Sequence, residues 1–239
     1  MYGMYGYGYG YGFDPTIILV LIGVALSLWA QGRVNSTFSR YSRVRSMTGM
    51  TGAEAARRLL NAQGIYDVTV QPIAGELTDH YDPRTKSVNL SQSVYGATSV
   101  AAIGVAAHEC GHAMQDNEGY APLRFRSALV PAANFGSKLS WPLILLGLVF
   151  GGLGSPLVEI GILMFSLAVL FQLVTLPVEY NASARAVRLL DSQGILAGEE
   201  VSGTRKVLNA AALTYVASGG DLDPAASSSH YSLWRKKQT

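Results

Sequence analysis

Two long uncharged stretches follow one another in the second half of this 239-residue chain. Residues 139–158 make twenty positions and residues 160–178 make nineteen, and only Glu159 separates them. At about 1.5 Å per helical residue, each stretch spans roughly 30 Å, the thickness of a bilayer core. Gly and Pro at 151–156 form a natural turn. The sequence therefore predicts a hairpin of two membrane helices, at residues 139–154 and 156–178; the alternative is an apolar hairpin buried within a soluble protein.

A third apolar stretch lies near the N-terminus, at residues 16–30. With its flanks it predicts a first membrane helix at residues 15–31, with Trp29 at the interface. A signal peptide is the alternative, but no Lys or Arg precedes the stretch and the residues after it make a poor cleavage site. Residues 1–14 are a Tyr/Gly-rich tract and residues 219–239 are Ser-rich, so both predict loosely ordered tails.

The composition favours a membrane protein. Charged residues make up 14% of the chain, hydrophobic residues 49%, and the mean hydropathy is +0.22; these values are unusual for a soluble domain. The net charge is only +2, without a basic stripe with interleaved aromatics, so nucleic acid is not an expected partner. Cys110 is the single cysteine, which excludes an internal disulfide and fits a reducing compartment.

Basic residues flank the three predicted spans on one side. They are Arg33, Arg40, Arg43, Arg45, Arg124, Arg126, Lys138, Arg185 and Arg188. By the positive-inside rule this side is cytoplasmic. We therefore expect an integral protein of a bacterial-type cytoplasmic membrane, with the N-terminus outside and with residues 32–138 and 179–218 in the cytoplasm.

The first cytoplasmic segment combines helix and strand signals. A capping box from Thr51 to Glu54 predicts a helix that ends near Gly64. Three strands are expected next, at residues 68–73, 76–81 and 86–91, and a turn makes a hairpin of the last two. The edge of this hairpin is either plain scaffold or a place where an extended peptide adds a strand. Further helices are expected at residues 99–115, at about 182–194 and at about 199–217.

The motif that carries chemistry is HECGH at residues 108–112. Because residues four apart share one helical face, His108 and His112 point the same way, and Glu109 lies at the edge of that face. This is the HExxH pattern, in which the histidines bind zinc and the glutamate acts as general base toward metal-activated water. Small residues along this helix favour close packing around the metal. Cys110 points off the ligand face and is expected to be a small core residue, not a nucleophile.

A catalytic zinc ion normally takes three protein ligands, so the motif is one ligand short. The chain has two other histidines, His80 in the predicted hairpin and His230 in the C-terminal tail. Glu179 is a stronger candidate, because the membrane hairpin returns the chain to the side that holds the motif. Its position alone fits an interfacial residue at a helix end equally well.

Longer segments resemble a known family. HECGH, two membrane helices and EYNASARA resemble the membrane-embedded gluzincins of the HtpX and CAAX-protease type. LTDHYDPRTKSVNLS, GVAAHECGHAMQ, APLRFRSALVPAANFGS and LNAAALTYVA are similar to the YugP-type family of neutral zinc metallopeptidases, from residue 14 to about residue 217. The resemblance implies Zn²⁺ as the cofactor and Glu179 as its third ligand. One position departs from the HtpX pattern: Ser183 replaces an acid that supports a zinc-bound histidine, so Ser183, Asn181 or another group is expected in that role.

These observations predict a mainly α membrane protein with three transmembrane helices and a gluzincin-like α+β cytoplasmic catalytic domain that contains a small β-sheet. The expected function is that of a membrane-bound zinc metalloendopeptidase, with Glu109 as general base and with peptides or membrane proteins as substrates. Tyr215 is the first candidate for stabilising the oxyanion, ahead of Arg185 and Arg205, although Tyr215 also fits a core position. The alternative function is a non-catalytic zinc-containing scaffold or adaptor, in which a fourth ligand such as His80 closes the coordination.

Overall fold

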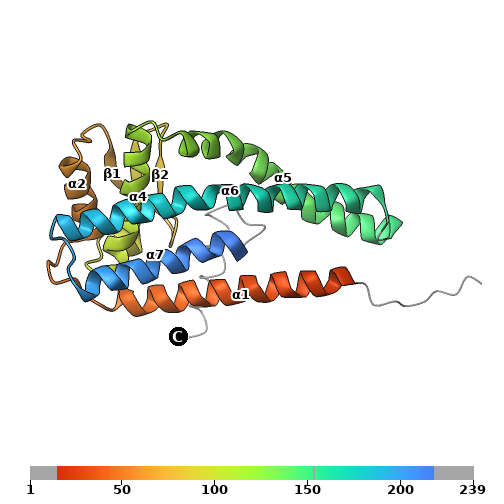
Figure 1. The fold of residues 1–239 in the computed structure, drawn as a ribbon, viewed down its shortest axis with the longest axis horizontal. Helices are drawn as coiled ribbons and strands as arrows, with labels where there is room; N and C mark the ends of the chain where they lie inside the picture. The colour runs from red at the N-terminus through yellow and green to blue at the C-terminus, as the bar shows by residue number, and fades with distance from the viewer. Residues whose placement is uncertain (1–14, 153, 218–239) are drawn as a thin grey trace, which may run out of the picture.

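The computed structural model describes residues 15–152 and 154–217 (Figure 1). These residues form a mainly helical fold with one small sheet, as predicted. The helices are α1 Pro15–Ser42, α2 Gly52–Ala62, α3 Gln92–Tyr95, α4 Val100–Asn117, α5 Ala121–Gly151, α6 Pro156–Ser192 and α7 Glu199–Ala217, and the strands are β1 Thr69–Ile73, β2 His80–Asp82 and β3 Ser87–Ser91. The tails predicted at residues 1–14 and 219–239 lie outside the described residues.

Helices α5 and α6 form a long antiparallel hairpin that extends away from the rest of the fold (Figure 1). The turn falls where the Gly and Pro residues predict it: Gly152 takes a φ of 72°, and the Ser155 side chain caps α6 by accepting from the Val158 backbone N–H. The helices approach closely at Gly161, where a Cβ would lie 3.0 Å from the Ser140 carbonyl oxygen. Both helices are long and apolar enough to cross a membrane.

The outward faces of this hairpin are apolar and exposed. Phe135 is 65% exposed, Val149 75%, Phe150 80% and Leu163 58%. A soluble protein seldom leaves so much contiguous apolar surface in water. The structure therefore contradicts the alternative of a hairpin buried within the chain.

The helices are longer than the spans predicted within them. Helix α5 begins at Ala121, well before residue 139, and α6 continues unbroken past residue 178 to Ser192. Helix α1 likewise continues past residue 31 to Ser42. The physical reason is that a change from apolar to polar residues marks where a helix leaves an apolar environment, and the backbone hydrogen bonds can continue across that change. Of the three predicted spans, the first, at residues 15–31, stays a prediction.

Strand β3 lies in the centre of the sheet, parallel to β1 and antiparallel to β2. All five of its residues are buried, and Val88 and Leu90 belong to the hydrophobic core with side chains of α2 and α4. The hairpin of β2 and β3 is confirmed, but β2 is shorter than expected. Gly75 and Leu77 have φ angles of 105° and 56°, which interrupt an extended backbone, so the strand begins only at His80.

Helix α4 packs against α2, α6 and α7. The Ser99 side chain caps it by accepting from the Ala102 backbone N–H. The capping box of α2 is present as predicted, with Thr51 and Glu54 each bonded to the backbone of the other. Cys110 lies in the core, where burial raises the pKa of its thiol, so its expected role as a small core residue is confirmed.

Candidate metal centre

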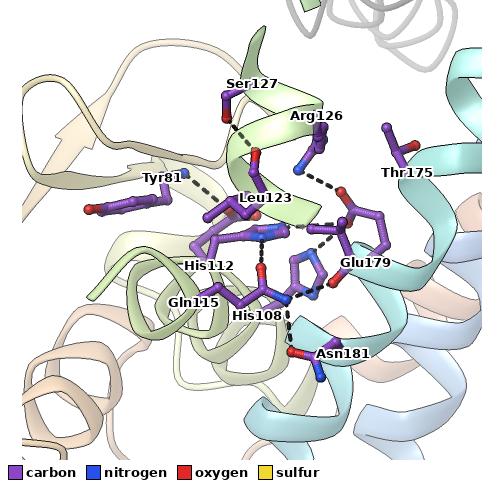
Figure 2. A network of polar contacts seen from close by, with 12 residues as sticks. Tyr81, His108, His112, Gln115, Leu123, Arg126, Ser127, Thr175, Glu179 and Asn181 are labelled. Atoms are coloured by element: carbon purple, nitrogen blue, oxygen red, sulfur yellow. Dashed lines mark hydrogen bonds and ion pairs between the residues drawn. The ribbon is translucent and has the colours of Figure 1, made fainter. Parts of the chain in front are cut away.

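Three metal-binding side chains meet where α4 passes α6. His108 and His112 come from α4 and Glu179 from α6, and one ligand-type atom of each lies within 4.8 Å of the others. The Glu179 Oε2 atom is 3.1 Å from His108 Nε2 and 3.5 Å from His112 Nε2 (Figure 2). All three residues were expected as zinc ligands from the sequence, and the structure brings them together. Within the described ranges, they are the His, Cys, Asp and Glu side chains grouped closely enough to hold a metal ion.

Gly111 allows the two helices to come this close. A Cβ at Gly111 would lie 2.5 Å from the backbone oxygen of Ala182 and 3.0 Å from its Cα. A Cβ essentially never comes as close as 2.5 Å to another heavy atom, and the obstacle here is helix backbone that cannot rotate away. The position between the two histidines therefore sets the spacing of α4 from the turn of α6 that carries Glu179.

A Gly111→Ala variant is expected to push α4 and α6 apart and to weaken zinc binding. Overpacking of this kind costs roughly 1–3 kcal/mol of stability, and the shift also misplaces Glu179 relative to the histidines. Zinc content after purification and the apparent melting temperature measure the two effects. Gly96→Ala is the matched control, since a Cβ at that exposed glycine meets nothing within 4 Å. Equal zinc content in both variants would contradict the proposed spacing role.

Gln115 fixes the tautomer of the His112 ring. Its side-chain amide donates to the Val178 carbonyl oxygen and to Asn181 Oδ1, each at 2.9 Å, so its Oε1 is left as an acceptor for His112 Nδ1 at 3.0 Å (Figure 2). The His112 ring must then carry its proton on Nδ1, which leaves the Nε2 lone pair toward Glu179 and a metal. Gln115 has no exposed surface. It therefore ties His112 to the same turn of α6 that supplies the third ligand.

His108 is held by the residue that departs from the HtpX pattern. Its Nδ1 atom lies 3.1 Å from Ser183 Oγ, one turn after Glu179 on α6. Of the partners expected from the sequence, Ser183 thus contacts His108 directly, and Asn181 reaches His112 through Gln115. Both histidines have a partner at Nδ1, and both direct Nε2 into the centre of the site.

A Gln115→Met variant is expected to lower zinc affinity about 10- to 100-fold, the usual effect of removing a residue that orients a metal ligand. The substitution keeps the volume but leaves the buried Nδ1–H of His112 without its acceptor. Competition with a zinc-binding dye measures the affinity, and Gln63→Met on the exposed end of α2 is the control. Gln115→Glu keeps an acceptor for His112 and should lose less; an unchanged affinity in Gln115→Met would contradict the orienting role.

Arg126 contacts the other oxygen of the third ligand. Its guanidinium NH1 lies 2.9 Å from Glu179 Oε1, while Oε2 faces the two histidines (Figure 2). Glu179 is only 1% exposed, so this ion pair fixes how its carboxylate is turned. In the sequence Arg126 is recognisable only as a cytoplasmic flank of the membrane hairpin. Its place beside the metal ligands depends on α5 starting much earlier than residue 139.

Glu109 lies beside the ligand group without belonging to it. Its Oε2 atom accepts a 3.0 Å hydrogen bond from the backbone N–H of Tyr81 on β2, and its residue is 8% exposed. The Tyr81 hydroxyl and the Lys86 ammonium both donate to Asp116 near the end of α4. These contacts hold the β2–β3 hairpin against α4, with a backbone N–H directed at the predicted general base.

A second carboxyl group, Asp79, is half-buried near Glu109. It accepts hydrogen bonds from the Ser91 backbone N–H at 2.8 Å and from the Ser91 hydroxyl. Burial is the main cause that raises the pKa of Asp79 to about 6; the nearby Glu109 charge acts in the same direction, and the hydrogen bonds from Ser91 oppose it. Because this pKa lies above the ordinary value of 3.8, the stability that Asp79 contributes is full below about pH 4 and is lost as the pH rises through about 6.

An Asp79→Asn variant is therefore expected to be more stable than the parent at neutral pH. The size of the pKa shift corresponds to a gain of about 2–3 kcal/mol in the free energy of unfolding. This gain disappears as the pH falls toward 4, because the parent carboxyl is then neutral as well. The melting temperatures of both proteins across this range measure the difference. A variant that is less stable than the parent at neutral pH would contradict the assigned protonation.

The structure places the remaining sequence candidates elsewhere or outside its described part. Tyr215 lies in the last turn of α7, but its side chain is outside the described residues, as is all of His230. Arg185 donates to Asn181 and pairs with Glu118. Arg205 lines a cavity of about 610 Å³ between α6 and α7, and this cavity reaches Ser183 without including the three ligands. His80 is exposed and engages both ring nitrogens, with the Thr78 carbonyl and with Asn89.

The donor set fits zinc. Two imidazole nitrogens and one carboxylate oxygen are typical ligands of a catalytic zinc ion. The electrostatics agree with a cation at the centre: burial disfavours a charged His108, yet Glu179 and Glu109 outweigh it and raise the pKa of His108 above its ordinary value. The site thus favours a bound cation. Zinc is such a cation, and its tetrahedral coordination accepts three convergent protein ligands.

Two histidines from one helix and a glutamate from a second form a ligand set that catalytic zinc sites of hydrolases use. Residues 16–220 match the family described as "Putative neutral zinc metallopeptidase", and the chain belongs to that family. It is 50% identical over 201 residues to the "Putative membrane protease YugP" of Bacillus subtilis (strain 168), which covers 84% of this chain and 88% of that protein. No solved structure matches the chain. The resemblance to the YugP-type family is therefore confirmed, together with zinc as the cofactor of the family.

Proposed function

We propose that this protein is a membrane-bound zinc metalloendopeptidase of the gluzincin type. The observation that carries the proposal is the convergence of His108, His112 and Glu179, with Glu109 beside them as a carboxylate outside the donor set. Three protein ligands leave a coordination position for water or substrate, which distinguishes a catalytic zinc site from a structural one.

Glu109 is the general base of the proposed reaction. A zinc ion in this site supplies a Lewis acid that polarises the scissile carbonyl and lowers the pKa of water. Glu109 accepts the proton of the attacking water and later delivers it to the leaving amine. The Tyr81 N–H holds one carboxylate oxygen in place, so the other oxygen can face the reacting groups. A donor for the oxyanion is also required, and Tyr215 is the residue that we assign to it.

We assign three transmembrane helices to the chain, with the N-terminus outside and the metal site on the cytoplasmic side. In support, the N-terminal end of α1 points the same way as the tip of the α5–α6 hairpin (Figure 1). The opposite end of α1 carries Arg33 and Arg40, and Arg43 follows directly after it, as the positive-inside rule requires of a cytoplasmic flank. The metal site lies where α5 begins and where α6 continues beyond its most apolar part.

The proposed substrates are peptide bonds at or near the membrane face, including those of membrane proteins. Strand β2 lies at an edge of the sheet, and its backbone already reaches Glu109 through Tyr81. An extended peptide that pairs with this edge would pass directly beside the general base. The alternative of a closed, structural zinc site receives no support from His80, because its ring nitrogens are engaged away from the three ligands.

Zinc-dependent cleavage tests the proposed function. The full chain, purified in detergent, is expected to cleave an unfolded protein substrate, to lose cleavage after treatment with a chelator, and to regain it when zinc is restored. Extraction of membranes with alkaline carbonate should leave the protein in the pellet. Cleavage that persists after zinc removal would contradict the metal mechanism, and release by carbonate would contradict membrane insertion.

A further inference from the structure

We propose that the groove between α1 and α7 binds the phosphate headgroup of an anionic phospholipid. The two helices pack against each other along the lower part of the fold (Figure 1). A cavity of about 440 Å³ lies between them. Arg33 and Arg40 line it from α1, and Lys206 lines it from α7. The proposal rests on the membrane insertion of α1 that is part of the proposed function.

The charge of this groove is one-sided. Three cations line the cavity, and no acidic residue is among the described residues that line it. Within the described part of the chain, none of the three has a carboxylate partner; Arg33 lies over the Trp29 ring and Arg40 over the Tyr41 ring instead. Like charges gathered in a concave surface raise its local positive potential, and an anion relieves their repulsion.

The groove also offers the donors that phosphate oxygens need. Thr37 contributes a hydroxyl and Asn209 a side-chain amide to its lining. Guanidinium groups match the geometry of phosphate oxygens, and an ammonium adds a point charge. Arginine, lysine, hydroxyl and amide side chains thus face one cavity from two helices.

The sequence of α1 above the groove explains why a lipid is the expected occupant. Leu26, Trp29, Arg33, Thr37 and Arg40 follow one another at steps of three and four, so they share one face of the helix. Leu26 is 53% exposed and Trp29 is 55% exposed, and both belong to the predicted span. This face is apolar within the predicted span and cationic just beyond it. A phospholipid has the same order, with its acyl chains in the bilayer and its phosphate at the surface.

Lipid binding by the intact protein tests this proposal. Full-length chain in a non-ionic detergent is titrated with phosphatidylglycerol or with phosphatidylcholine, and bound lipid is counted by native mass spectrometry. The Arg33→Gln/Lys206→Gln double variant is expected to bind phosphatidylglycerol roughly 30-fold more weakly than the parent, since each basic residue near an anionic surface contributes about fivefold. Arg58→Gln/Arg84→Gln, with the same loss of charge on exposed residues outside the groove, is expected to bind like the parent.

Three results would overturn the proposal. Equal binding of phosphatidylglycerol by the groove variant and the parent would show that the groove is not the site. Equal binding of phosphatidylcholine would show that headgroup charge is not recognised. Displacement of the lipid by an equal concentration of inorganic phosphate would show that the groove binds free phosphate. Zinc content and cleavage are measured on the same samples; if they are normal while lipid binding is unchanged, the lipid site fails and the peptidase assignment stands.

Discussion

A Glu109→Gln variant is expected to keep its zinc and to lose cleavage by about 10²- to 10⁴-fold, the usual contribution of a general base. Glutamine has nearly the same shape, and its amide oxygen can still accept from the Tyr81 N–H that now holds the carboxylate. It cannot take a proton from water. Because Glu109 is not among the three grouped ligands, the metal should remain bound.

Rates and zinc content measured on one preparation separate these two effects. Glu76→Gln is the matched control, since Glu76 is an exposed glutamate outside the ligand group. It should cleave at the parent rate. Parent-like cleavage by Glu109→Gln would refute Glu109 as the base, and loss of zinc would mean that Glu109 is a ligand.

A Glu179→Ala variant is expected to lose zinc affinity by more than about 100-fold, since removal of a mere supporting residue already costs up to that much. Only His108 and His112 would remain as protein ligands. The change also removes the carboxylate that faces the Arg126 guanidinium at 2.9 Å, so a negative charge next to the metal position is lost. Competition with a zinc chelator of known affinity measures the loss.

The sequence alone could predict the ligands for two different reasons. His108, Glu109 and His112 follow from the helical period, which is local, and the structure confirms their common helix. Glu179 follows two long apolar stretches, so its place depends on the hairpin returning to the same side, and only the family resemblance favours it over an interfacial role. The prediction of Glu179 as the third ligand therefore depends on the predicted turn at residues 151–156.

The residues that orient the ligands could not be predicted in this way. Gln115 is three positions after His112 and lies on a nearby face of α4. It can orient the His112 ring only because Val178 and Asn181 are within hydrogen-bond distance of its amide. Arg126 depends on where α5 passes over α6. These contacts come from the approach of separate helices, which no local period encodes.

The sheet shows the same limit. Alternating residues and a turn predicted the β2–β3 hairpin, because its pairing is local. The parallel pairing of β1 with β3 brings together strands that are not adjacent in sequence, and it makes β3 the buried centre of the sheet. The exposed edge left to β2 is where the backbone reaches Glu109, so the tertiary order of the strands decides which one faces the site.

The zinc content per chain of Glu179→Ala, beside that of Glu159→Ala, tests most directly whether the α5–α6 hairpin completes the metal site. Both variants remove a glutamate from α6, but Glu159 is exposed in its first turn and far along the helix from the histidines. With three protein ligands, the parent and Glu159→Ala should retain about one zinc ion per chain, and Glu179→Ala should retain almost none. A full complement of zinc in Glu179→Ala, bound with parental affinity, would show that the third ligand is another residue.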